Sequence, residues 1–144
     1  MTALPAIAPA RSDSDREFRL RRLFVLDGLI AVPIALAYLL ASPLVSALVG
    51  VTAERVVWAG IVLSGFALLS LLTARCRPLA RWAAIAVIAV NTGWVLATAI
   101  TVVAEANELT GLGWGYLIAQ SLFATSFAIL EARALILLTR SDTE

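Results

Sequence analysis

Four long apolar stretches constrain this 144-residue chain more than any other feature of its sequence. A helix that crosses the roughly 30 Å hydrocarbon core of a bilayer needs about 20 mostly apolar residues. None of the four shows the alternation of apolar and polar residues that is typical of a membrane-barrel strand. They cover about residues 23–41, 53–73, 82–104 and 112–133, and the last stays apolar to residue 138. The sequence therefore predicts an all-α membrane protein, with an antiparallel four-helix transmembrane bundle over residues 23–139.

The composition agrees with this class and excludes several kinds of chemistry. Hydrophobic residues make up 61% of the chain and charged residues 15%, whereas a soluble domain is nearer one half and one quarter. The chain has no histidine and one cysteine, Cys76, which excludes histidine-ligated metal or haem sites and an intrachain dithiol couple. The net charge of +1 provides no overall field for nucleic acid. We expect no cofactor, no metal ion and no nucleic acid partner.

The distribution of arginine predicts how the chain lies in the membrane. Five arginines precede residue 23, three lie in the loop at residues 74–81, and two lie near the C-terminus. The other two loops contain only Arg55. Since basic loops stay on the cytoplasmic side, this predicts a multi-pass protein of the cell inner membrane with both termini cytoplasmic. Trp58, Trp114 and Tyr116 are then expected at the outer interface, and Trp82 at the inner one.

The segments outside the predicted spans are short. Residues 1–22 mix charges of both signs and predict a polar, basic cytoplasmic tail, with a short interfacial helix as the less favoured alternative. Between the first two spans, Ser42 as a cap, Pro43 and Gly50 predict a brief interfacial helix. Thr52 is expected to cap the second span. Thr110 and Gly111 are expected to form a turn and a cap before the fourth span.

Polar residues of the third span recur at steps of three and four, which places them on one helical face. The fourth span has a similar line, so the two faces together predict a polar seam. The candidate seam residues are Asn91, Trp94, Thr98, Thr101 and Gln120. We favour hydrogen bonding between helices, with an Asn91–Gln120 bond as one form, because amides often join membrane helices. The alternative is a site for a solute, an ion or a cofactor headgroup.

Asp27 and Glu131 are the candidate membrane-embedded carboxylates, near the cytoplasmic ends of the first and fourth spans. Ion pairing with nearby arginines is the favoured interpretation, because an ionised group at this depth needs a partner. The alternatives are a carboxyl that binds and releases a proton, and a cation site shared by both carboxylates.

The second half of the chain carries a pattern of short motifs. They are Asn91-Thr92-Gly93-Trp94, Glu108-Leu109-Thr110, Leu112-Gly113, Ile118-Ala119-Gln120, Phe127-Ala128 and Leu130-Glu131. In these motifs, mainly over residues 91–131, the chain resembles a group of uncharacterised small four-span integral membrane proteins of bacteria. The resemblance implies the four-helix topology and a bacterial inner membrane, and it implies no activity.

Two functions remain open at this point. The chain has no set of residues typical of a catalytic site, so we expect that it is not an enzyme. Its small loops and its stripes of small residues favour an accessory or assembly subunit of a larger membrane complex, whose partners are the lipid bilayer and another membrane protein. Small residues alone are weak support for a homo-oligomer. The alternative is a transporter or channel for a small solute, an ion or protons that uses the polar seam.

Overall fold

The computed structural model describes residues 9–141, and over these residues every regular element is a helix. The five helices are α1 (Pro9–Leu40), α2 (Ser42–Val49), α3 (Ala53–Arg75), α4 (Arg81–Ala104) and α5 (Gly111–Ser141). Four of them are long and apolar enough to cross a membrane. The predictions of an all-helical chain and of four spans are therefore confirmed. The fourth span extends beyond residue 133, because the apolar sequence continues there.

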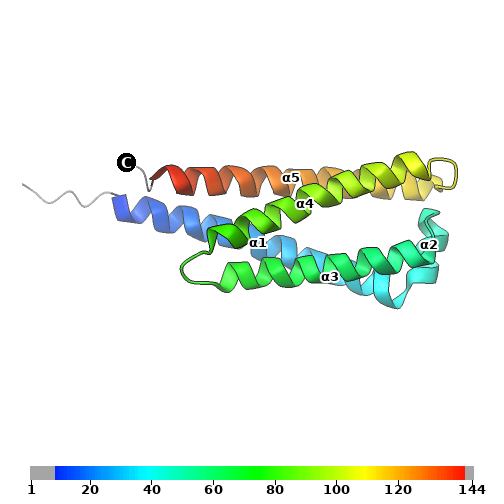
Figure 1. The fold of residues 1–144 in the computed structure, drawn as a ribbon, viewed down its shortest axis with the longest axis horizontal. Helices are drawn as coiled ribbons and strands as arrows, with labels where there is room; N and C mark the ends of the chain where they lie inside the picture. Colours follow the sequence, from blue (N-terminus) through cyan, green and yellow to red (C-terminus); the bar gives the residue numbers. More distant parts are fainter. Residues whose placement is uncertain (1–8, 142–144) are drawn as a thin grey trace, which may run out of the picture.

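The four long helices lie side by side along the long axis of the molecule (Figure 1). The short helix α2 and the α4–α5 loop lie at one end, which we call the α2 end. The α3–α4 loop, the start of α1 and the end of α5 lie at the other, which we call the loop end.

The start of the chain differs from the predicted tail. Helix α1 begins at Pro9 and runs without a break into the first span, while residues 1–8 lie outside the described part. Leu20 is fully buried, and the Arg21 guanidinium donates to the Ala74 carbonyl oxygen at 2.7 Å and to the Glu17 carboxylate. Residues 9–22 thus form a helical extension, because their arginines, glutamate and leucine favour helix and their last turns pack on the end of α3.

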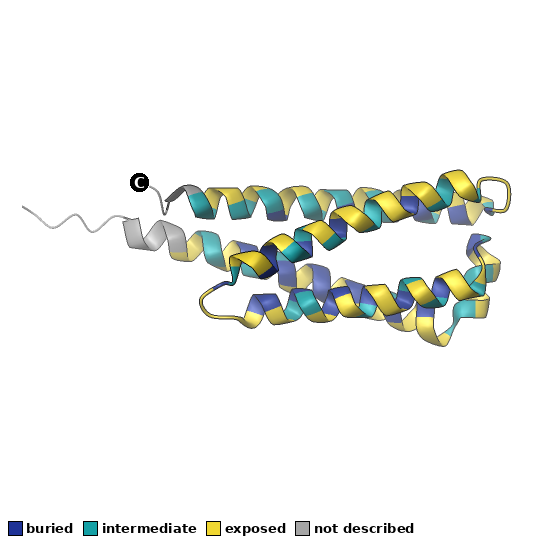
Figure 2. Ribbon diagram, in the orientation of Figure 1, coloured by how far each residue is buried: buried dark blue, intermediate teal, exposed yellow. Residues whose placement is uncertain are grey.

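Burial follows one stripe of each helix (Figure 2). Many large apolar side chains lie outside these stripes and are exposed. Exposed large side chains include Leu40, Val103 and Ile100. A soluble monomer rarely leaves so much contiguous apolar surface in water, whereas lipid covers it without cost. The distribution of burial therefore agrees with a multi-pass membrane protein.

The loop end of the bundle is closely packed. Leu20 and Phe24 of α1 and Ala84 and Val87 of α4 are fully buried in one cluster there. The Ser70 hydroxyl donates to the Phe24 carbonyl oxygen at 2.9 Å, which ties α3 to α1. These contacts close the interior of the bundle toward the loop end.

The α2 end is held by a junction of α2 with the α4–α5 loop. The predicted brief helix is present, and it ends at Gly50 in the left-handed conformation (φ 87°), although Ala41 rather than Ser42 caps its start. The Thr110 backbone N–H donates to the Val49 carbonyl oxygen at 3.1 Å, and its hydroxyl donates to that of Leu48. The Gly113 N–H donates to the Thr110 hydroxyl oxygen at 2.9 Å, so Thr110 caps α5 as predicted.

We predict that Gly113→Ala destabilises the protein by about 2 kcal/mol, the scale of overpacking a filled site. A Cβ at this position meets the Val49 carbonyl oxygen at 1.9 Å, and backbone atoms cannot rotate away. The free energy of unfolding in detergent measures the effect. Gly115→Ala is the matched control, because a Cβ there meets nothing within 4 Å. Equal stability of the two variants would contradict the close packing of α2 against α5.

Candidate functional site

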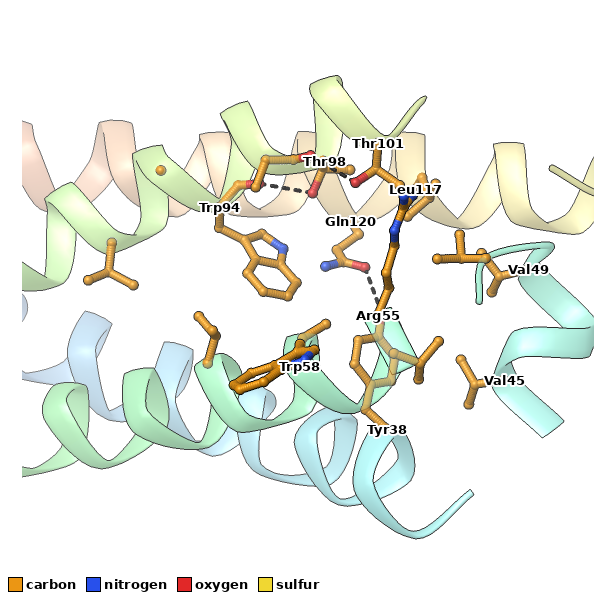
Figure 3. A pocket seen from close by; sticks show the side chains of 17 residues that line it. Tyr38, Val45, Val49, Arg55, Trp58, Trp94, Thr98, Thr101, Leu117 and Gln120 are labelled. Carbon is orange, nitrogen blue, oxygen red and sulfur yellow. Dashed lines mark hydrogen bonds between the residues drawn. The ribbon is translucent and has the colours of Figure 1, made fainter. Parts of the chain in front are cut away.

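A cavity of about 450 Å³ lies between α3 and α4 toward the α2 end. Its lining is mostly apolar, and α1, α2 and α5 also contribute side chains. Figure 3 shows the indole rings of Trp94 and Trp58 and the amide of Gln120 directed into this space. A mostly apolar cavity of this volume with a few polar groups is typical of a site for a small organic ligand.

The structure brings four of the five predicted seam residues to this cavity. Trp94, Thr98 and Thr101 of α4 and Gln120 of α5 all line it. The hydroxyls of Thr98 and Thr101 donate to the carbonyl oxygens of Trp94 and Ala97 in their own helix, at 2.9 and 3.0 Å. Their hydrogen atoms are therefore engaged by the backbone, as is common for threonine in membrane helices.

Gln120 bonds to α1 rather than to Asn91. The Tyr38 hydroxyl donates to Gln120 Oε1 at 3.2 Å and lies 2.6 Å from the Tyr116 hydroxyl. With its own hydrogen directed to Gln120, Tyr38 accepts from Tyr116. These three side chains join α1 to α5 at the wall of the cavity, and the predicted Asn91–Gln120 bond is not among the contacts of either amide.

An ion pair stands at the edge of the cavity toward the α2 end. Arg55, from the first turn of α3, pairs with Glu105, which follows the last residue of α4. The side chain of Glu105 is 11% exposed, that of Arg55 is 56% exposed, and Arg55 also lines the cavity. The pair therefore joins the two helices that border the cavity and offsets the charge of Arg55 there.

A second cavity of about 50 Å³ lies next to the first, toward the middle of the bundle. The two cavities share the lining residues Val90, Trp94 and Gln120. Asp27 and Asn91 line the second cavity and not the first. The fifth seam residue, Asn91, thus lies nearer the middle of the bundle than the other four seam residues.

Three buried polar side chains from three helices meet at that depth. The Asn91 amide nitrogen donates to Asp27 Oδ2 at 2.7 Å and lies 3.5 Å from Glu131 Oε2. Asp27 and Asn91 are each 5% exposed, and Glu131 is 0% exposed. Among residues 9–141, the contacts of the two carboxyls are with Asn91 and with each other, where ion pairs with arginines were the favoured prediction.

Arg21, one of the arginines expected to reach Asp27, contacts another part of the bundle. Arg21 is six residues before Asp27 and its side chain lies on the end of α3. Asn91, by contrast, occupies the buried stripe of α4 beside both carboxyls.

Sequence reasoning did not select Tyr38, Arg55 or Trp58 as site residues. One signal for Tyr38 was present, because Asp27, Ala31, Ala35 and Tyr38 recur at steps of four, four and three on one face of α1. Arg55 and Trp58 give no such signal, since an arginine and a tryptophan at the end of a span are typical of any membrane interface.

Comparisons of the chain with protein family models, with curated proteins and with solved structures found no match. The resemblance of residues 91–131 to small four-span bacterial membrane proteins therefore stays a prediction.

Proposed function

We propose that this protein is a small transporter that binds a mostly apolar solute in the cavity between α3 and α4. One observation carries the proposal: the ligand-sized cavity lies next to a second cavity that Asp27 lines, and the two have Trp94 and Gln120 in common, a boundary that we call the Trp94–Gln120 neck. The fully buried cluster at the loop end closes the path beyond that point. A route open toward one end and packed at the other is the arrangement expected of one state of an alternating-access carrier.

The lining favours a solute with aromatic or aliphatic surface and one positive charge. Trp58 and Trp94 offer indole faces, which attract cations as well as apolar rings. The nearby charge of Arg55 is offset by Glu105, whereas within the described part of the chain the deeper Asp27 and Glu131 contact no arginine. Both features attract a lipophilic cation.

In the membrane, we propose an antiparallel four-helix bundle with both termini and the α3–α4 loop on the cytoplasmic side. The arginines of residues 9–22 and of the loop at residues 76–80 and its flanks support this orientation through the positive-inside rule. The α2 end and the main cavity then face the outside of a bacterial inner membrane.

The proposal predicts that Gly93→Phe strongly reduces solute uptake while the protein stays folded. Gly93 lines the main cavity, and a Cβ there meets nothing within 4 Å, so a ring has room to occupy the solute's space. Uptake of ethidium, a planar aromatic cation, into proteoliposomes should fall about tenfold or more, the effect of losing about 1.4 kcal/mol of binding.

Gly65→Phe is the matched control. A Cβ at Gly65 also meets open space, but Gly65 does not line the cavity. We expect uptake by this variant to equal that of the wild type, with unchanged thermal unfolding of both variants. Equal uptake by all three proteins, or no uptake by any, would contradict transport through this cavity.

The second candidate function is the accessory subunit, and the burial of α5 favours it. In an 18-residue apolar stretch of α5, only 11% is buried inside the protein. The corresponding buried share in the other three spans is 28% to 39%. A helix with so little packing of its own offers a face to a partner helix. Native mass spectrometry after mild solubilisation tests this: the 15.3 kDa chain within a larger hetero-complex supports the role, and the chain alone contradicts it.

A further inference from the structure

The cluster of Asp27, Asn91 and Glu131 has an excess of negative groups and a shortage of donors. The hydrogen-bond donor within it is the Asn91 amide, which reaches Asp27 Oδ2 at 2.7 Å and Glu131 Oε2 at 3.5 Å. Glu131 Oε1 is fully buried and has no hydrogen-bond partner among the described residues. One acceptor in the centre of the bundle is therefore left for a further donor.

The neighbouring helices supply no compensating charge. Around the cluster α3 presents Leu63 and Phe66, and α1 presents Ala31 and Ile34, none of which titrates. The titratable groups that face one another here are Asp27 on α1 and Glu131 on α5, with the neutral Asn91 on α4. Two carboxylates in an apolar interior are costly unless a positive charge joins them.

The geometry favours a proton over a metal ion as that charge. Hard metal ions take six or more oxygen ligands, whereas the side chains here offer two carboxyls and one amide. The amide also directs its N–H group, and not its oxygen, toward the carboxyls. Over residues 9–141 no three carboxylate or thiol side chains gather closely enough to hold a metal ion. A proton needs only the two carboxyls, which already contact each other.

The two neighbouring cavities outline a path for the proton from the main cavity. The second cavity, of about 50 Å³, has room for a water molecule and is bordered by the polar groups of Asp27, Asn91 and Gln120. It meets the main cavity at Val90, Trp94 and Gln120. A water molecule in the second cavity would connect the Asp27 carboxyl to the main cavity and so to the α2 end.

We propose that Asp27 and Glu131 share one exchangeable proton, which reaches them through the Trp94–Gln120 neck and is exchanged for the cationic solute. A hydronium ion in the cavity transfers its proton to a carboxylate oxygen, which forms the O–H bond and leaves water behind. When a cationic solute occupies the main cavity, the proton returns to water, and the total charge of the site stays constant. The exchange with a solute rests on the proposed transport function, whereas the shared proton does not.

Infrared difference spectroscopy of the protein in lipid tests the shared proton without any solute. The wild type should show a carboxylic acid C=O band that disappears as the pH is raised and shifts in D₂O. Asp27→Asn and Glu131→Gln should each remove that titrating band, while Glu108→Gln, which changes an exposed carboxyl in the α4–α5 loop, should keep it. In Gly93→Phe the band should remain and shift more slowly in D₂O, because the ring blocks the path.

The outcomes separate the two ideas. A wild type without the band, or a band that persists in both carboxyl variants, overturns the shared proton whatever the transport result. If one of the two carboxyl variants does not fold, the infrared spectrum of the other variant alone decides the test. A band that behaves as expected, together with ethidium uptake that ignores an imposed pH gradient, overturns the exchange and leaves transport intact. The expected band with no uptake in any protein overturns the proposed transport alone.

Discussion

Replacing Asn91 with leucine is expected to destabilise the protein by about 1 to 3 kcal/mol, the scale of leaving a buried acceptor without its hydrogen-bond donor. The Asn91 amide nitrogen donates to Asp27 Oδ2, and it also lies 3.5 Å from Glu131 Oε2. Leucine has a similar volume but no donor, so the variant isolates the loss of hydrogen bonding from the loss of packing. Unfolding in mixed detergent micelles, followed by circular dichroism, measures the difference.

Two further proteins make this result specific. Thr92→Leu is the matched control, because Thr92 is the next residue of α4, exposed, with its hydroxyl bonded to the Ile88 carbonyl oxygen at 2.9 Å. The triple variant Asp27→Leu, Asn91→Leu, Glu131→Leu should recover most of the lost stability, since well-packed apolar groups often replace a buried polar cluster without penalty. If the triple variant is as unstable as Asn91→Leu, packing and not the two carboxyls accounts for the loss.

Much of the fold could be predicted from the sequence, because continuous apolar runs and the residues that begin or end helices are local signals. The brief helix over residues 42–49 illustrates this, since Pro43 and Gly50 fix its ends whatever packs against it. The start of α1 was harder to predict. The mixed charges of residues 11–22 are typical of a solvated tail, and only the contact of Leu20 and Arg21 with α3 shows that their helix packs.

For the candidate site, the sequence predicted which residues share a face of one helix but not which helices those faces contact. The spacing of Asn91, Trp94, Thr98 and Thr101 gave their common face, but not the helices they meet. Which amide bonds which acid depends on how α1 packs against α4 and α5, and no local pattern encodes that. The sequence therefore led to the expectation that the two carboxyls form ion pairs with arginines. In the structure each carboxyl instead contacts Asn91 and the other carboxyl.

Phe24→Ala should destabilise the protein by about 3 kcal/mol, within the range for removing a fully buried aromatic side chain. It should also raise the passive leak of protons across proteoliposomes several-fold. Phe24 is fully buried and precedes Asp27 by three residues, about one helical turn toward the loop end. Phe24 therefore lies on the loop-end side of Asp27, within the packed cluster where the proposed path for protons is closed. Unfolding in detergent and the decay of an imposed pH gradient measure the two effects.

Phe18→Ala is the matched control, since it removes the same ring from the same helix at a position that is 60% exposed. We expect this variant to match the wild type in stability and in leak. The leak is expected because the ring of Phe24 belongs to the fully buried cluster that closes the loop end, and its removal leaves a cavity there. A large loss of stability without any leak would mean that the seal extends beyond Phe24 to the other fully buried residues of the loop end. No loss of either kind would contradict the close packing on which the one-sided path depends.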